Sequence, residues 1–151
     1  MNKILTFLKS ILVPILLGSL VGFFISGNMM YEQMPKPFLA PPGIVFPIVW
    51  TILYALMGVS YGILKNNNLV DAKTSFIYYG QLLVNLIWPV AFFVLDLKLF
   101  SFLWIILLII LVVAMIKIFY DKNKLSGLLQ IPYLIWLCFA AYLNLSIFLM
   151  S

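Results

Sequence analysis

Long apolar runs dominate the chain, and short segments that contain most of the charged side chains separate them. There are five such runs, each about 20 residues long, which is the length that an α-helix needs to cross the hydrocarbon core of a bilayer. Strands of a membrane β-barrel alternate apolar and polar residues, whereas these runs are continuous. The pattern therefore predicts an all-α membrane protein, a single domain built as a bundle of five transmembrane helices. The expected helices are residues 5–26, 43–64, 75–95, 99–120 and 125–150.

The connection between the first two runs, residues 27–42, is the longest in the chain. It contains Glu32, Lys36 and four of the eight prolines. Because proline fixes φ and interrupts helices, we expect an extended loop here. Loops of this length are usually functional or disordered, and the aromatic and proline content argues against disorder.

Composition supports a surface that faces lipid. Of the 151 residues 66% are hydrophobic and 9% are charged, compared with about 25% charged in soluble domains. The mean hydropathy is +1.19. The chain has no histidine, and its single cysteine, Cys138, lies inside an apolar run. Disulfide frameworks and the usual zinc sites are therefore excluded, an iron or copper site is disfavoured, and we expect no required cofactor.

The lysines predict an orientation in the membrane. A basic chain can bind nucleic acid, but these lysines lie mostly in the breaks between apolar runs, so we expect no nucleic-acid partner. If the N-terminus is cytoplasmic, seven lysines lie on the inside and two, Lys36 and Lys98, on the outside. The positive-inside rule then predicts a multi-pass protein of the cell membrane with a cytoplasmic N-terminus.

A cleaved signal peptide that ends near Ser26 is the competing interpretation of the first run. Its apolar stretch is long for a signal core, and no Ala-x-Ala-like cleavage site follows it. The first loop emerges outside in either case.

Polar side chains recur at helical spacing in the third run. Tyr78, Gln81, Asn85 and Trp88 share one helical face, and Asn85 lies near the middle of the membrane, where an unpaired amide is costly. Two interpretations remain open: an interhelical hydrogen bond that holds the bundle together, or a polar contact in a ligand pocket.

Aromatic residues in the second and fifth runs allow a similar choice. Trp50 lies one turn from Tyr54, and Trp136, Ala140 and Asn144 share one face of the fifth helix. Such aromatics belong either to ordinary packing and an interfacial belt or to the wall of a pocket. Small-residue motifs, Gly18-x-x-x-Gly22 and Gly58-x-x-x-Gly62, permit close helix contact within one protomer or between protomers.

No catalytic constellation is visible in the sequence. The acids Glu32, Asp71, Asp96 and Asp121 all lie in breaks, and no carboxylate pair or Ser-His-Asp set occurs within the spans. Ion-coupled transporters usually need an ionisable group inside the membrane, so active transport is disfavoured as well.

Three separated motifs, in order, resemble the TspO/MBR family, the tryptophan-rich sensory and translocator proteins. The first runs from Pro35-Lys-Pro-Phe-Leu-Ala-Pro-Pro-Gly43 to Trp50-Thr-Ile-Leu-Tyr54. The second is Gln81-Leu-Leu-Val-Asn85-x-x-Trp88, and the third joins Pro132-Tyr133-x-x-Trp136 to Phe139-Ala-Ala-x-Leu-Asn144.

The resemblance implies a five-helix bundle, usually a homodimer, with a ligand pocket between the helices under the first loop. It implies a receptor or sensor for porphyrins such as protoporphyrin IX or haem, and for other lipophilic small molecules. Light-dependent porphyrin breakdown is implied as a side activity rather than as enzymatic turnover. Carried onto this chain, the implied pocket residues are Tyr31, Pro41, Trp50, Asn85, Trp136 and Ala140.

Three departures from the family pattern bear on these expectations. Leu39 stands where the family often has tryptophan, and Asp96 lies in a turn that is often basic. No Lys or Arg follows Lys124, so the animal sterol motif near the end of the last helix is absent. Two alternatives to a receptor stay open: a passive carrier or channel for lipophilic molecules, and a membrane scaffold subunit.

Overall fold

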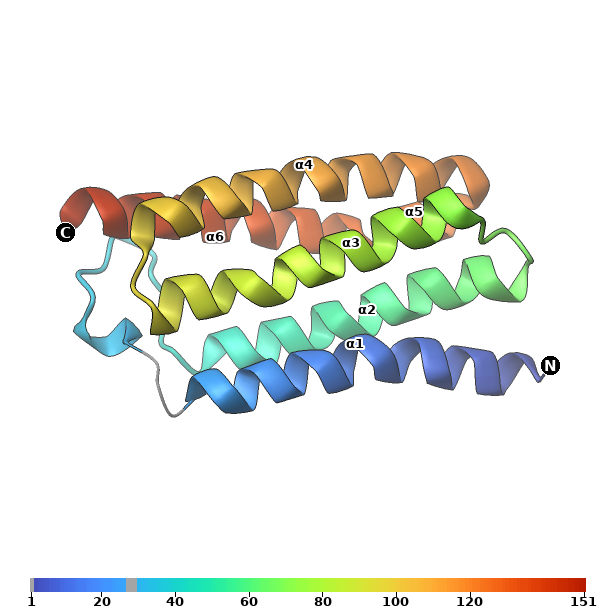
Figure 1. Cartoon of the computed structure of the whole chain (residues 1–151), viewed down its shortest axis with the longest axis horizontal. Helices are drawn as coiled ribbons and strands as arrows, with labels where there is room; N and C mark the ends of the chain where they lie inside the picture. The colour runs from blue at the N-terminus through green and yellow to red at the C-terminus, as the bar shows by residue number, and fades with distance from the viewer. Residues whose placement is uncertain (1, 27–29) are drawn as a thin grey trace.

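A computed structural model of the chain, which describes residues 2–26 and 30–151, is an elongated bundle of helices (Figure 1). No strand occurs within these residues. Three of the helical elements are short: the 3-10 turn η1, the π-helical turn η2, and α5. In chain order the elements are α1 (Lys3–Ser26), η1 (Tyr31–Gln33), α2 (Val45–Asn66), α3 (Ala72–Pro89), η2 (Val90–Val94), α4 (Lys98–Lys122), α5 (Lys124–Leu128) and α6 (Ile131–Met150).

In the described part of the chain, five helical segments are long and apolar enough to cross a bilayer, which confirms the predicted all-α class. Every observed bound lies within three residues of its predicted position. The chain is therefore a multi-pass membrane protein. Residues 27–29, which belong to the expected first loop, lie outside the described residues.

The two ends of the bundle differ in charge. The N-terminus, the α2–α3 turn and the α4–α5 connection lie at one end, whereas the first loop and the C-terminus lie at the other (Figure 1). Seven of the nine lysines belong to the first end, and Lys36 and Lys98 to the second. The lysine asymmetry used for the topology prediction is thus an asymmetry between two ends of one bundle.

Glycines bring α1 and α2 into close contact over the half of the bundle nearer the N-terminus. A Cβ on Gly58 would overlap the backbone of Ser10 and Ile11 in α1. A Cβ on Gly62 would lie 2.8 Å from the ring of Phe7. The Gly58-x-x-x-Gly62 motif therefore forms an intramolecular seam, one of the two arrangements that the sequence allows.

The same two helices diverge towards the first loop. Gly18 still faces the ring of Tyr54 closely, so a Cβ at Gly18 would overlap that ring. One turn further along α1, a Cβ on Gly22 would find no atom within 4 Å. Hence only the first glycine of the Gly18-x-x-x-Gly22 motif belongs to the seam, and the second faces open space.

Two proline positions interrupt predicted continuous helices. Pro89 ends α3, and the next five residues form the π-helical turn η2 before the chain turns into α4. The predicted fifth helix is two helices, α5 and α6, which separate just before Pro132. Proline lacks the amide hydrogen that would continue the preceding helix. At its other end, α5 begins at a cap, because the Asn123 side chain accepts from the Ser126 amide at 3.1 Å.

Candidate ligand-binding site

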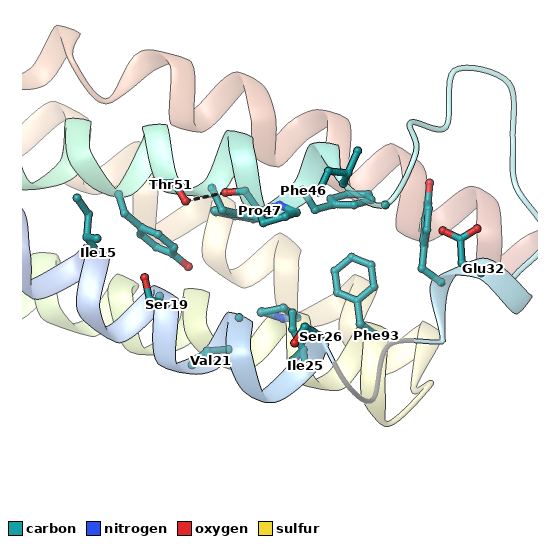
Figure 2. A pocket seen from close by; sticks show the side chains of 18 residues that line it. Ile15, Ser19, Val21, Ile25, Ser26, Glu32, Phe46, Pro47, Thr51 and Phe93 are labelled. Atoms are coloured by element: carbon teal, nitrogen blue, oxygen red, sulfur yellow. Dashed lines mark hydrogen bonds between the residues drawn. The ribbon is translucent and has the colours of Figure 1, made fainter.

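A cavity of about 610 Å³ lies between α1 and α2 where the helices diverge (Figure 2). One wall is formed by α1 from Ile15 to Ser26, which contributes small and apolar side chains together with the Ser19 and Ser26 hydroxyls. The second wall comes from α2, Pro89 and Phe93 close the third side, and η1 forms the end near the loop. The residues that α2 contributes are Phe46, Pro47, Trp50, Thr51 and Tyr54.

Tyr31 holds the first loop over the end of the cavity by a hydrogen bond and by aromatic packing. Its side chain is buried, and its hydroxyl donates to the Pro41 carbonyl oxygen at 2.6 Å. Its ring packs edge-on against Phe46 and Phe93, with centroid distances of 5.1 and 5.9 Å. Burial first, and then the negative charge of Glu32, raises the pKa of Tyr31 to about 12, so the phenol remains a hydrogen-bond donor at neutral pH.

Two further hydrogen bonds hold the loop to the helices. The Met30 amide donates to the Phe93 carbonyl in η2 at 2.8 Å. The Tyr142 hydroxyl of α6 donates to the Phe38 carbonyl at 2.7 Å. The next residue, Leu39, adopts a left-handed backbone with φ of 75°. The described part of the loop is therefore an ordered cover, as its prolines predict.

Lys36 is turned towards the loop itself. Its ammonium lies 4.8 Å from the centroid of the Tyr31 ring and donates to the carbonyl oxygens of Glu32 and Met34, both at 3.3 Å. Lys36 does not belong to the described cavity lining, in which Glu32 is the only charged residue. Figure 2 shows Glu32 at the loop end, beyond Phe46 and Phe93.

Trp50 and Trp136 contact each other, but only Trp50 faces the cavity. Trp50 lines the cavity and stacks on Tyr54 at 5.7 Å. Trp136 meets Trp50 edge-on at 6.3 Å and lines a shallow apolar groove between α2 and α6 instead. The buried indole nitrogens of both residues have no hydrogen-bond partner in the described part of the chain.

Asn85 lies in a hydrogen-bonded chain at the centre of the bundle. Its Oδ1 accepts from the Tyr54 hydroxyl at 2.6 Å, and its Nδ2 donates to the Tyr133 oxygen at 2.8 Å. The Tyr133 hydroxyl donates in turn to Gln81 Oε1 at 2.7 Å. The chain joins α2, α3 and α6, which corresponds to the interhelical interpretation of Asn85.

The six residues implied by the resemblance therefore occupy three different places. Tyr31 and Trp50 line the cavity, and Pro41 accepts the hydrogen bond of Tyr31. The other three are not part of the described lining: Asn85 lies in the central network, Trp136 packs against Trp50, and Ala140 is fully buried on α6.

Three of the cavity residues, Glu32, Gly22 and Phe93, could not be recognised from the sequence. Glu32 carried no motif, and Gly22 was assigned to a packing motif. Phe93 lies in a π-helical turn that apolar periodicity does not reveal. For Glu32, the only signal was its position next to Tyr31, one of the pocket residues that the resemblance implies.

Comparison with known proteins gives consistent matches. The model of the TspO/MBR family matches residues 10–150. The chain is 36% identical over 152 residues to the tryptophan-rich protein TspO of Archaeoglobus fulgidus, with 99% of both chains covered. It is 34% identical over 130 residues to the protein CrtK of Rhodobacter capsulatus, which covers 83% of this chain and 81% of the relative. It is 33% identical over 135 residues to the translocator protein of Homo sapiens, which covers 85% of this chain and 80% of the relative. None of these names denotes an enzyme.

Proposed function

Because the chain belongs to the TspO/MBR family, we propose that it is a membrane receptor or sensor that binds porphyrins and related lipophilic molecules in the cavity between α1 and α2. The observation that carries the proposal is the cavity itself. Its volume of about 610 Å³ falls within the range of roughly 300–1,000 Å³ that is usual for small-molecule sites.

The chemistry of the walls suits a flat, apolar π-system. Trp50 and Phe46 offer aromatic faces and edges, and Tyr31 closes the end of the space under the loop. Aromatic pairs gain about 0.5–1.5 kcal/mol beyond the area that they bury, so a tetrapyrrole ring gains from such walls. A scaffold subunit whose aromatics only pack against one another would not require this space.

The extent of the cavity favours a receptor over a channel. Its described lining starts at Ile15 of α1 and reaches Tyr54 of α2, so it occupies the half of the bundle that lies under the first loop. Towards the other end, Gly58 and Gly62 hold the two helices in contact. A continuous path across the membrane would have to cross this seam.

Titration of the purified protein with protoporphyrin IX tests the proposal. Bound porphyrin should quench tryptophan fluorescence, and the quenching should saturate. Quenching that stays linear with porphyrin concentration, as in empty detergent micelles, would contradict the proposal.

Uptake into proteoliposomes without an energy source would favour a passive carrier instead. Parallel samples in darkness and in light measure porphyrin breakdown as a side activity, and the mass of the detergent-solubilised protein tests the expected homodimer.

A further inference from the structure

The described polar groups around the cavity are unbalanced in charge. Glu32 contributes a carboxylate at the mouth, and no lining residue among those described contributes a cation. Two ion pairs occur in the described part of the chain, Lys98 with Asp96 and Lys122 with Asp71, and Glu32 belongs to neither. A ligand that enters the cavity therefore meets a carboxylate that has no ion-pair partner.

Most lining hydroxyls point their protons away from a ligand. Tyr31 donates to the Pro41 carbonyl at 2.6 Å, and Tyr54 donates to Asn85 at 2.6 Å. Thr51 donates to the Pro47 carbonyl at 2.7 Å, a bond drawn in Figure 2. The Ser26 hydroxyl donates in the same way, to the Phe23 carbonyl at 2.9 Å. A hydroxyl whose proton is committed offers a ligand only its lone pairs, so these groups act as acceptors.

Two nearby donors do not offset this imbalance at the mouth. The Lys36 ammonium is held by two backbone carbonyls and the Tyr31 ring, and it lies outside the described lining. The Trp50 indole N–H has no partner in the described structure, but it is neutral and lies one turn further along α2 than Phe46. The polar end of the cavity is therefore rich in acceptors and negatively charged.

We propose that the cavity selects lipophilic ligands whose polar end is a cation or a hydrogen-bond donor, with Glu32 as the specificity-determining residue at its mouth. The inference rests on the proposed binding function and narrows its ligand class. Among tetrapyrroles, the propionate groups of a free acid meet a like charge at Glu32. A ring of the same shape that carries esters avoids this repulsion, and one that carries ammonium groups is attracted.

The expected effect is moderate because Glu32 is exposed. Interactions between exposed charges are weak, so we expect a change in affinity of roughly threefold. The effect should weaken in about 1 M salt, where the Debye length falls to about 3 Å.

The test compares three porphyrins that share one ring. Protoporphyrin IX carries two carboxylates, its dimethyl ester is neutral, and its bis(2-aminoethyl)amide carries two ammonium groups. Dissociation constants are measured by tryptophan quenching in an uncharged detergent at low salt, for the wild type and for Glu32→Gln. Relative to the wild type, Glu32→Gln should bind the diacid roughly threefold more tightly and the diamine roughly threefold more weakly, with the ester unchanged. Comparing the two proteins for each ligand cancels differences in partition into the micelle.

Two variants serve as controls. Asp121→Asn removes an exposed carboxylate at the far end of α4 and should leave all three affinities unchanged. Lys36→Gln tests whether the loop cation selects carboxylates instead. The inference is overturned, while porphyrin binding stands, if Glu32→Gln binds all three porphyrins with the dissociation constants of the wild type. The same holds if Lys36→Gln, and not Glu32→Gln, changes the affinity for the diacid by weakening it. If no porphyrin gives saturable quenching with the wild type, the proposed function fails, and the inference fails with it.

Discussion

The Tyr54 hydroxyl donates to the Oδ1 atom of Asn85 at 2.6 Å, and this bond links the wall of the cavity to the buried network of α2, α3 and α6. One residue thus has two roles, because the ring of Tyr54 lines the cavity and also fills the space against Gly18 of α1.

Replacing Tyr54 with phenylalanine should destabilise the bundle. The variant keeps the ring and leaves a buried acceptor on Asn85 without its donor, at a cost of about 1 kcal/mol in the free energy of unfolding. Denaturant titration in mixed micelles measures the change. Tyr120→Phe is the matched control because Tyr120 is exposed on α4. Equal shifts in the two variants would show that the Tyr54–Asn85 bond adds nothing to stability.

Leucine at two glycine positions should give opposite results. Gly58→Leu forces a side chain into the backbone of α1 and should cost about 2 kcal/mol or more, because overpacking of a close contact strains the structure. Gly22→Leu meets no atom within 4 Å and projects into the cavity lining, so it should leave the melting temperature unchanged and weaken porphyrin binding. A loss of stability in Gly22→Leu, or a normal melting temperature in Gly58→Leu, would contradict this account of the seam.

Tryptophan substitutions should separate cavity contact from packing. Trp50→Phe should weaken porphyrin binding several-fold, because an aromatic contact contributes about 0.5–1.5 kcal/mol beyond the area effect. Trp136→Phe should have a smaller effect because Trp136 does not line the cavity and contacts its wall from behind, through Trp50 and Phe46. Affinities come from porphyrin absorbance, which does not depend on the number of tryptophans.

Trp104→Phe is the control for this series. Trp104 lies on α4 and donates to the Val84 carbonyl at 2.8 Å, so its loss should lower stability without changing porphyrin affinity. If Trp104→Phe and Trp50→Phe weaken binding equally, the assigned cavity is not the porphyrin site.

Asp71 caps the N-terminus of α3 by accepting from the Thr74 amide at 2.8 Å, and this cap should make stability depend on pH in the acidic range. Hydrogen bonds from the Thr74 side chain and backbone, together with Lys122, hold the pKa of Asp71 well below its usual range. A carboxyl with a lowered folded-state pKa contributes stability above its unfolded pKa of about 3.9 and loses it as the pH falls towards the folded value. The wild type should therefore melt above Asp71→Ala at pH 5–7, and the two melting curves should converge below about pH 4. A constant difference down to pH 2 would contradict the role of the ionised carboxylate.

Topology provides an independent prediction. Seven lysines at the end that holds the N-terminus and two at the opposite end predict a cytoplasmic N-terminus and an external C-terminus. A C-terminal reporter that is active only in the cytoplasm should give no signal, and an N-terminal fusion should be active. High activity at the C-terminus would reverse the assignment and place the cavity mouth on the cytoplasmic side.

The spans could be predicted from the sequence because their cause is local. An apolar run long enough to cross a bilayer must satisfy its own backbone hydrogen bonds, and only a few residues at each end are ambiguous. The division of the last span was missed because Pro132 by itself is compatible with a kinked helix. The break becomes definite only with the packing of α5, where Ser126 exchanges hydrogen bonds with Ser60 of α2, and this contact is a tertiary feature.

The arrangement of the site was less accessible because it depends on which faces meet. Spacing placed Trp50 and Trp136 on separate helices but could not reveal that one indole covers the other. The Gly18-x-x-x-Gly22 motif looks uniform in sequence, yet only Gly18 meets a neighbour. Whether Asn85 faces a ligand or other helices was open for the same reason, and the hydroxyls of Tyr54 and Tyr133 determine it.

The divergence of α1 and α2 has a consequence for the surrounding lipid. The two helices are held together near Gly58 and separate towards Gly22, so the angle between them determines how wide the cavity is. Transmembrane helices adjust their tilt when the hydrocarbon thickness of the bilayer does not match their apolar length. A change in tilt of α1 about this fixed contact widens or narrows the space beside Trp50. We therefore expect the affinity for the proposed ligand to depend on acyl-chain length, so that bilayer thickness would act on this protein in the manner of an effector.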